Sequence, residues 1–316
     1  MASADLRSMQ AISVIVPLYN KRPTLARALD SILAQEGVSF EVIVVDDDSN
    51  DGSTEVALAY GEKIRYIHQQ NAGPAAARNR GVLESRCGLV AFLDADDELL
   101  PGCLLAHVKC RELSPAARLS ICSSRAIHLD GSTQEVRLAD RVKGLRAVDE
   151  FYFTERLCAE LTRYVYVGCV DRELFDEVGG FDEGLRSWEI TDFNLRASLA
   201  SPVVGIINDI YINVYETPGS QSTITHKDSK YMFSFAEKLL SLIGKIPQDQ
   251  HEPIVKQIDS ILGALWANGA IAEFKWLASK AERELSGCRP SHKLNMLGKL
   301  PETVLKVLYE VRKLKA

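Results

Sequence analysis

Short apolar runs alternate with segments of helical periodicity through the first two thirds of the chain. The apolar runs predict strands at residues 11–16, 40–45, 64–68 and 88–93. Most of these runs are almost wholly apolar, which is typical of strands buried on both faces of a parallel sheet. Between the strands, residues 24–35 and 74–84 carry apolar side chains at helical spacing. The pattern therefore predicts an α/β fold with a Rossmann-like, mostly parallel sheet that helices cover.

The pattern changes near residue 225, where strands stop and long helical periods follow. These periods predict helices at residues 231–243, 254–267 and 270–285. We therefore expect two domains, residues 1–225 with the sheet and residues 226–316 with the helices. Trp266, Phe274 and Trp276 lie in the helical part and are interpreted as core or interface residues rather than as a cofactor site.

The last segment, residues 301–316, has the pattern of a basic amphipathic helix. Its apolar positions share one face, and Lys306 and Arg312 lie elsewhere. Such a helix can lie on an anionic membrane surface, which would make the protein peripherally membrane-associated. It can equally dock on a protein surface with its lysines solvated, and this second interpretation is favoured. The helical part can also serve as an interface between copies of the chain.

Composition and charge narrow the functional classes. With 46% apolar and 25% charged residues, the 316-residue chain is typical of globular proteins. A formal net charge of −6 gives no support for a nucleic-acid partner. Residues 1–10 are polar and show no secretory signal, and no apolar run is long enough to span a bilayer. These features favour a cytoplasmic protein.

The cysteine pattern agrees with that compartment. Seven cysteines occur without CxxC or CxxH spacing, which argues against zinc, and an odd number argues against a disulfide framework. Cys103, Cys110 and Cys122 stand among apolar neighbours and are interpreted as core residues, as is Cys158. His107 likewise shows no spacing typical of a metal site.

An acidic cluster, Asp94-Ala95-Asp96-Asp97, directly follows the predicted strand at residues 88–93. Open α/β sheets bind ligands at the carboxyl ends of their strands. Three adjacent carboxylates repel one another unless a cation lies among them, and a hard divalent ion accepts oxygen ligands. An acidic turn before a helix is the alternative. Within the cluster, Asp97 is interpreted as the N-cap of a helix beginning near residue 100.

Two further residues are expected at the same edge of the sheet. Tyr19 follows the first predicted strand and Asp47 follows the second. An aromatic ring that stacks, a carboxylate that accepts base N–H groups and a metal-binding acidic cluster together indicate a nucleotide diphosphate site. The chain lacks both GxGxxG after the first strand and GxxxxGK[ST], which argues against dinucleotide dehydrogenases and P-loop enzymes. The phosphates would therefore be held through a metal ion.

Four segments carry a family resemblance, and they occur in the family's order and spacing. They are SVIVPLYN at residues 13–20, VDDDSNDGS at 45–53, NAGPAAARNRG at 71–81 and LDADD at 93–97. The chain resembles family 2 glycosyltransferases, inverting enzymes of the GT-A fold, over approximately residues 11–200. A nucleotidyltransferase on a related fold is disfavoured, because it typically needs a glycine-rich loop after the first strand.

The resemblance implies roles for particular residues. Pro17 and Tyr19 would flank the base, Asp47 would accept hydrogen bonds from it, and Arg78 would lie near the diphosphate or the sugar. Asp94-Ala95-Asp96 would be the DxD motif, in which Asp96 is the metal ligand and Asp94 helps to hold the ribose or sugar. His226 falls where some family members place a loop that closes on the diphosphate, and it is a further candidate metal ligand.

The chain departs from the family at the catalytic base. The family places this base in a Glu-Asp pair after a segment that reads GGFDE here, at residues 179–183. In the alignment on Arg196, Ile190 occupies the aspartate position, and isoleucine accepts no proton. The remaining candidates are Glu189 and Asp192, which share a helix face. Glu189 is favoured because it adjoins Trp188.

The resemblance implies an activity. It is a Mn²⁺- or Mg²⁺-dependent transfer of a hexosyl or N-acetylhexosaminyl group from a nucleotide sugar, and the expected donor is a UDP-sugar. The acceptor would be a hydroxyl of a glycan or a lipid-linked saccharide in polysaccharide biosynthesis. The missing aspartate leaves a second hypothesis open, a catalytically impaired nucleotide-sugar-binding partner subunit.

Overall fold

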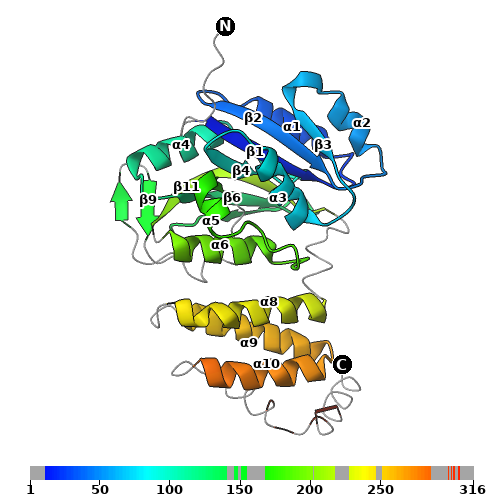
Figure 1. Ribbon diagram of the computed structural model, residues 1–316, viewed down its shortest axis with the longest axis vertical. Coiled ribbons are helices and arrows are strands. Elements are labelled where there is room, and N and C mark those ends of the chain that lie inside the picture. Colours follow the sequence, from blue (N-terminus) through cyan, green and yellow to red (C-terminus); the bar gives the residue numbers. More distant parts are fainter. Residues whose placement is uncertain are drawn as a thin grey trace. The chain divides into compact units, whose positions relative to one another are not determined.

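The structure is a computed structural model of the 316-residue chain. It describes residues 11–140, 146–148, 151–154, 168–201, 203–217, 228–246, 251–285, 298, 300, 302, 305 and 306. His226, Cys158 and most of the segment 301–316 lie outside the described residues. The chain divides into two compact units, Met1–Pro218 and Gly219–Ala316 (Figure 1).

The first unit is built on one mixed sheet. Among the described residues the strand order is β3-β2-β1-β4-β10-β6-β11-β9-β8, with β5 paired to β11 and β7 paired to β6. The strands of the first half are β1 (Ala11–Leu18), β2 (Ser39–Asp46), β3 (Arg65–His68) and β4 (Leu89–Phe92). The others are β5 (Glu98–Leu99), β6 (Leu119–Ile127), β7 (Thr133–Val136), β8 (Arg146–Val148), β9 (Phe151–Thr154), β10 (Cys169–Asp171) and β11 (Val204–Tyr215).

The direction of the strands confirms the mostly parallel core of the sheet. The strands β1 to β4 are parallel to one another, and β11 is parallel to β6. Only the short β10 runs antiparallel between β4 and β6 in this central part of the described sheet. The carboxyl ends of β1, β2, β4, β6 and β11 therefore lie at one edge.

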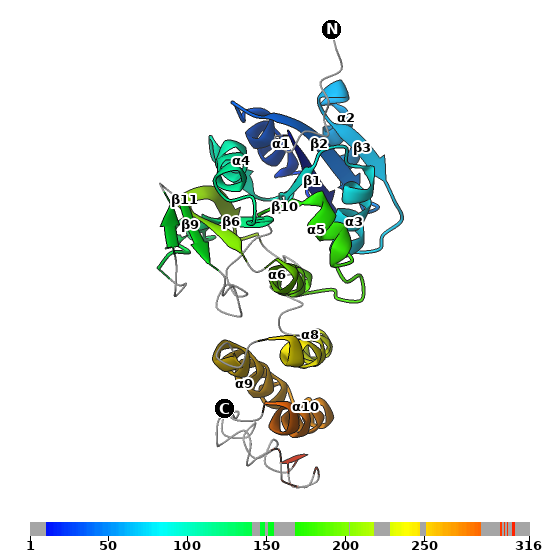
Figure 2. The same ribbon diagram turned by 60° about the vertical axis from the view of Figure 1, so that its left-hand side comes forward.

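Helices cover both faces of the sheet, as the continuous apolar strands predict. The helices are α1 (Leu25–Leu33), α2 (Ser53–Leu58), α3 (Pro74–Glu84), α4 (Cys103–Leu113), α5 (Arg172–Glu177) and α6 (Glu189–Ala200), with a 3₁₀ turn at Gly61–Lys63. One apolar core lies under α1 and α4, and a second lies under α3, α5 and α6. Figure 2 shows these two groups of helices on opposite sides of the strands. The predicted helices at residues 24–35 and 74–84 correspond to α1 and α3.

A glycine brings α3 close to the sheet. A Cβ atom at Gly81 would lie 2.3 Å from Cγ2 of Ile15 on β1. Helix α3 begins after Gly73, whose φ of +96° suits glycine, and Pro74 occupies the first turn. This close approach places the first turns of α3, with Arg78, beside the carboxyl edge of the sheet.

The second unit contains three described long helices. They are α8 (Ser229–Leu242), α9 (His251–Ala267) and α10 (Ile271–Glu284), with a 3₁₀ turn at Ile243–Lys245. Phe274 is fully buried, and its ring centroid lies 5.6 Å from that of Trp266. Trp276 is 41% exposed and packs against Phe233. In the described part of the chain, no helix combines the length and apolar character that a bilayer span needs.

Candidate active site

The predicted nucleotide residues lie together at the carboxyl edge of the sheet. Leu18 at the end of β1 is in register with Asp46 at the end of β2, and β4 ends beside β1. Pro17 is half-buried in β1, and Tyr19 follows it with 41% of its surface exposed. An exposed ring at this edge is available for stacking.

Asp47 holds the loop that leads into α3. Its Oδ1 accepts hydrogen bonds from Gln69 Nε2 and from the Ala72 amide, both at 2.8 Å. Its Oδ2 accepts a hydrogen bond from the Gly73 amide, also at 2.8 Å. A carboxylate offers about four acceptor positions, so these contacts leave room for another donor. The role of Asp47 as an acceptor for a nucleotide base stays a prediction.

Asp46 is fully buried beneath this edge. Its carboxylate accepts hydrogen bonds from the Ser49 amide, Thr54 Oγ1 and Tyr66 Oη. Burial alone would raise the pKa of Asp46, but these hydrogen bonds hold it below its ordinary value of 3.8. Because the folded-state pKa is depressed, the resulting stabilisation is present above pH 3.8 and is lost as pH falls through the folded pKa.

The acidic cluster forms a compact set of oxygen donors. Asp94, Asp96 and Asp97 each offer one carboxylate oxygen, and these atoms lie within 4.8 Å of one another. Carboxylate oxygens are the donors that Mg²⁺ and Mn²⁺ prefer, so the residues present fit such an ion. Ala95 is buried between them, and its carbonyl accepts a hydrogen bond from Thr24 Oγ1 at 2.9 Å.

Asp96 already has a cationic partner within the chain. Its carboxylate forms an ion pair with Lys21 Nζ and accepts a hydrogen bond from Thr217 Oγ1 at 3.1 Å. Lys21 lies three residues after the end of β1, and Thr217 lies two residues after the end of β11. Both residues therefore reach the acidic cluster from the same edge of the sheet.

The prediction that Asp97 caps a helix is wrong. Helix α4 begins at Cys103, and its N-cap is Gly102, with a φ of +85°. The two-residue strand β5 lies in between and pairs with β11. Asp97 is buried and accepts a hydrogen bond from the Tyr215 amide at 3.1 Å. Burial and the neighbouring carboxylates of the cluster raise the pKa of Asp97 well above its ordinary value.

Arg78 joins the acidic cluster to α6. Its Nη2 donates to Asp94 Oδ1 at 2.7 Å, and its Nη1 donates to Glu189 Oε1 at 2.9 Å. Arg78 is 3% exposed, and its guanidinium lies 5.5 Å from the ring centroid of Phe181. Burial alone would lower the pKa of Arg78, but the two carboxylates raise it above its ordinary value. The side chain is therefore a fixed cation between two acidic groups.

A pocket opens beside this arginine. Arg78, Asp94 and Asp97 supply its polar lining, and Ile190 lies among the apolar residues that complete it, together with Phe92, Leu93 and Ile212. Ile190 is the residue that aligns with the family's catalytic aspartate. An aliphatic side chain thus faces the place where the resemblance implies a carboxylate.

The two candidate bases on α6 have different surroundings. Glu189 is 8% exposed and contacts Arg78 through Oε1. Asp192 is 1% exposed, and its Oδ2 accepts hydrogen bonds from Arg196 Nε at 2.8 Å and Nη2 at 2.6 Å. Arg196 also donates to the carbonyls of Val178 and Gly180. Asp192 is thereby connected through Arg196 to the turn before α6. Glu189 instead contacts Arg78, which lines the pocket.

Sequence reasoning missed the partners of the acidic cluster. Lys21 could have been found, because it lies two residues after Tyr19 and must emerge at the same edge. Tyr215 ends β11 and Thr217 follows it, and this strand was not among those predicted. Tyr215 Oη donates to Glu98 at 2.7 Å, and the guanidinium of Arg27 stacks on its ring, 3.5 Å from the centroid.

Comparison with solved structures defines the class of the fold. The chain is similar to S. aureus TarS (residues 1–349), with 16% identity, a TM-score of 0.60, and coverage of 95% of this chain and 91% of that chain. The same protein in complex with UDP-GlcNAc gives 17% identity and a TM-score of 0.61 at the same coverage. The first unit, which contains the mostly parallel sheet and the acidic cluster, therefore has the GT-A fold.

Sequence comparison identifies the family. Residues 13–116 match the family described as Glycosyl transferase family 2. EpsJ of Bacillus subtilis, described as an uncharacterized glycosyltransferase, is 30% identical over 224 residues, which are 68% of this chain and 64% of that protein. The succinoglycan biosynthesis protein ExoO of Rhizobium meliloti is 36% identical over 122 residues, 38% of this chain and 35% of that protein. The first unit contains a domain of glycosyl transferase family 2, and the chain spans less than two thirds of either relative.

Proposed function

We propose that this chain is a metal-dependent inverting glycosyltransferase that moves a sugar from a UDP-sugar to an acceptor hydroxyl. One observation carries the proposal. In a family 2 domain, an exposed Tyr19, the carboxylate of Asp47 and the acidic cluster at Asp94 to Asp97 emerge at the same edge of a parallel sheet. Open α/β sheets bind ligands at such an edge.

The comparisons support a uridine nucleotide as the donor. TarS, which shares the fold, has been solved with UDP and with UDP-GlcNAc. In this chain Tyr19 would stack on the base, with Pro17 beside it, and Asp47 would accept a hydrogen bond from the base through its remaining acceptor position. The transferred group would be a hexosyl or N-acetylhexosaminyl residue.

The diphosphate would be held at the acidic cluster. Asp94 and Asp96 would hold Mn²⁺ or Mg²⁺, which when bound neutralises charge on the leaving diphosphate. His226 stays a predicted further ligand. Lys21 shares the carboxylate of Asp96, so this lysine and the ion compete for the same oxygen atoms. Arg78 fixes Asp94 on the side that faces the pocket.

On the acceptor side, Glu189 would remove the proton from the attacking hydroxyl. Inversion requires a base on the face opposite the leaving group. Glu189 borders the pocket through Arg78, which fixes the position of its Oε1 and leaves Oε2 for a substrate hydroxyl. Asp192 is the weaker candidate, because Arg196 occupies one of its oxygens and its side chain is fully buried.

The pocket also favours a second candidate function. Ile190 takes the place of a proton acceptor in the pocket lining, and this observation supports a nucleotide-sugar-binding subunit without turnover. Such a subunit would bind UDP in the presence of the metal and assist a catalytic partner. Measured release of UDP from a UDP-sugar by the purified chain would exclude it.

Binding and turnover should be measured together. The protein is screened by thermal shift against UDP-, GDP- and dTDP-sugars with Mn²⁺ or Mg²⁺, because a ligand of the folded state raises Tm. We expect UDP-sugars with metal to raise Tm and Asp96→Asn to abolish the effect. The exposed Asp130, in a turn away from the acidic cluster, provides the control Asp130→Asn. If no nucleotide raises Tm and no UDP is released, the proposal is wrong.

The acceptor is proposed to be a glycan or a lipid-linked saccharide. The similarity to ExoO, a succinoglycan biosynthesis protein, supports a role in polysaccharide biosynthesis. We further propose a cytoplasmic protein, in which peripheral membrane contact through residues 301–316 is the alternative to docking of that segment on a protein surface. Co-sedimentation with anionic vesicles of the full chain and of a chain ending near residue 300 tests this contact. Equal binding of the two chains would refute it.

A further inference from the structure

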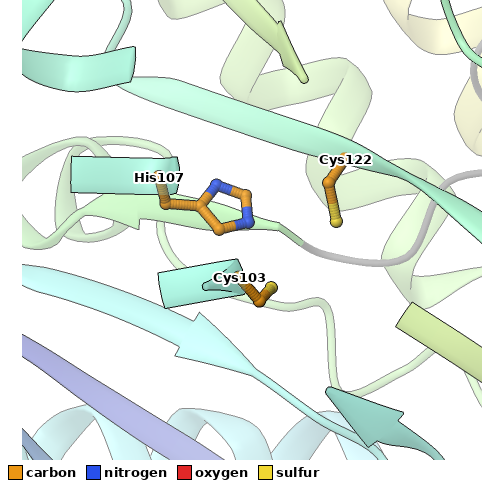
Figure 3. Close-up of side chains that lie close together, drawn as sticks. All are labelled: Cys103, His107 and Cys122. Carbon is orange, nitrogen blue, oxygen red and sulfur yellow. The ribbon is translucent and has the colours of Figure 1, made fainter. Parts of the chain in front are cut away.

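A second group of potential metal ligands, separate from the acidic cluster, lies under α4. Cys103 and His107 are one helical turn apart on α4, and Cys122 lies on β6. One ligand atom from each residue lies within 4.8 Å of the other two. The residues are 1%, 3% and 8% exposed, respectively. Figure 3 shows the imidazole and the two sulfur atoms turned toward one another between helix and strand.

The imidazole is held in one orientation. His107 Nδ1 lies 2.8 Å from Ser120 Oγ, which is also on β6. This hydrogen bond leaves Nε2 for the two sulfur atoms, and Figure 3 shows a ring nitrogen directed toward Cys122. Histidines that bind metals typically have their other nitrogen held in this way, which fixes both the tautomer and the ring plane.

The surroundings of the three side chains are apolar, because Cys103 and Cys122 belong to the buried core under α1 and α4. A buried thiolate needs a cation beside it, because an isolated charge in an apolar core is very costly.

We propose that Cys103, His107 and Cys122 bind one Zn²⁺ ion that clamps α4 to β6. Two thiolates and one imidazole form a Cys₂His set, which zinc accepts with a fourth position for another ligand. Two thiolates also cancel the charge of a divalent ion, so the buried group is neutral. Mg²⁺ and Mn²⁺ prefer oxygen and would stay at the acidic cluster. The proposal does not depend on the proposed glycosyl transfer.

The clamp would stabilise the segment that follows the acidic cluster. Helix α4 begins six residues after Asp97, and Cys103 is its first residue. An ion that binds only the folded state stabilises it in proportion to the logarithm of ligand over Kd. At 100-fold excess over Kd, the Tm of the first unit should rise by roughly 5–10 °C.

The experiment uses the full chain produced in zinc-supplemented medium and purified with reductant. Bound zinc is measured by inductively coupled plasma mass spectrometry, and about one ion per chain is expected. Cys103→Ser and Cys122→Ser should each lose the ion. Cys110→Ser is the matched control, because Cys110 is buried in the same apolar core and lies outside the three-residue set. Asp96→Asn should keep the zinc.

Two measurements on the wild-type chain test the proposal even if the variants fail to fold. Chain refolded with Co²⁺ should show thiolate-to-cobalt charge-transfer absorption, which oxygen ligands do not give. Alkylation mapped by mass spectrometry should label Cys103 and Cys122 faster after chelation, with Cys110 unchanged. Absence of zinc from the reduced wild-type chain would overturn the proposal. Zinc that persists in Cys122→Ser or disappears in Asp96→Asn would also overturn it. So would a Cys103–Cys122 disulfide that remains in the chain purified with reductant.

Discussion

The assignment of the base predicts that Glu189→Gln suppresses turnover while donor binding survives. The substitution keeps the size of the side chain. In the wild-type chain Arg78 Nη1 lies 2.9 Å from Glu189 Oε1, and the amide oxygen of glutamine can accept the same hydrogen bond. It removes the group that accepts the proton. General base catalysis contributes about 10²–10⁴-fold, so kcat should fall by that factor. The barrier would rise by about 2.7–5.5 kcal/mol.

The same substitution also weakens an ion pair, and this effect must be separated from catalysis. Arg78 is 4% exposed in its side chain and keeps Asp94 as its second partner. Breaking a buried pair costs about 3–5 kcal/mol, and a glutamine that still accepts the hydrogen bond should cost less. Each kcal/mol lowers Tm by roughly 2–4 °C in a domain of this size. Assays well below the lower Tm therefore compare folded proteins.

The assay is release of UDP under saturating donor, with KM for the donor and the Kd for UDP measured in parallel. A base predicts a loss in kcat with KM and Kd little changed. A residue that only positions Arg78 predicts a raised donor KM instead, since Arg78 also holds Asp94. Asp192→Asn is the matched control. It should lower Tm through the lost pair with Arg196 and leave kcat within about threefold.

Near-wild-type kcat in Glu189→Gln would end the assignment of Glu189 as base. A loss confined to Asp192→Asn would transfer the role to that residue. If both variants lose the same factor in kcat with unchanged Tm, the different surroundings of Glu189 and Asp192 do not decide which residue is the base.

Three further predictions test other parts of the first unit. Asp46→Asn should lower stability by about 1–3 kcal/mol at pH 7 and by progressively less as pH falls below 3.8, measured by urea unfolding, and a pH-independent difference would contradict the depressed pKa. Lys21→Ala should raise Mn²⁺ affinity in the presence of UDP by roughly fivefold in calorimetry, because it frees Asp96, and weaker binding would refute the competition. Gly81→Ala should lower the free energy of unfolding through overpacking by about 1–3 kcal/mol, whereas Gly263→Ala, in open space on α9, should raise the stability of that helix by up to about 1 kcal/mol. Equal effects of the two alanines in thermal unfolding would argue against the close approach of α3 to β1.

The central strands and helices were predictable because each buries a continuous apolar pattern. Strands β1, β2 and β4 and helices α1 and α3 match the predicted ranges closely, since their apolar residues are buried in the two cores. The edge strand β3 also lies where it was predicted, although its residues are only half-buried or exposed. The strands β6, β10 and β11 were not predicted. β6 contains the polar run Ser123-Ser124-Arg125, and β10 has three residues, so neither shows a clear period. Their placement depends on pairing across the sheet rather than on local pattern.

The shared position of the residues proposed to bind the donor could be predicted for the same topological reason. Tyr19, Asp47 and the acidic cluster follow predicted parallel strands, so the sheet brings them to one edge whatever the loops do. The contacts among them were beyond prediction. The pairing of Arg78 with Glu189 joins residues 111 positions apart, and it depends on where α6 packs against α3. Helical periodicity gives the face of each helix, but not which two faces meet.

Residue spacing alone could not show that Cys103, His107 and Cys122 lie together. Zinc motifs are recognised when ligands follow one another in a short loop, and this chain has none of the usual spacings. Cys103 and His107 instead share a helix face at i and i+4, which by itself is common in buried helices. The third residue, Cys122, comes from a strand that local pattern did not indicate. Only the packing of α4 on β6 brings the three ligand atoms together. The apolar environment, which argued for simple core cysteines, also favours the proposed zinc site, because two thiolates and one Zn²⁺ form a neutral group.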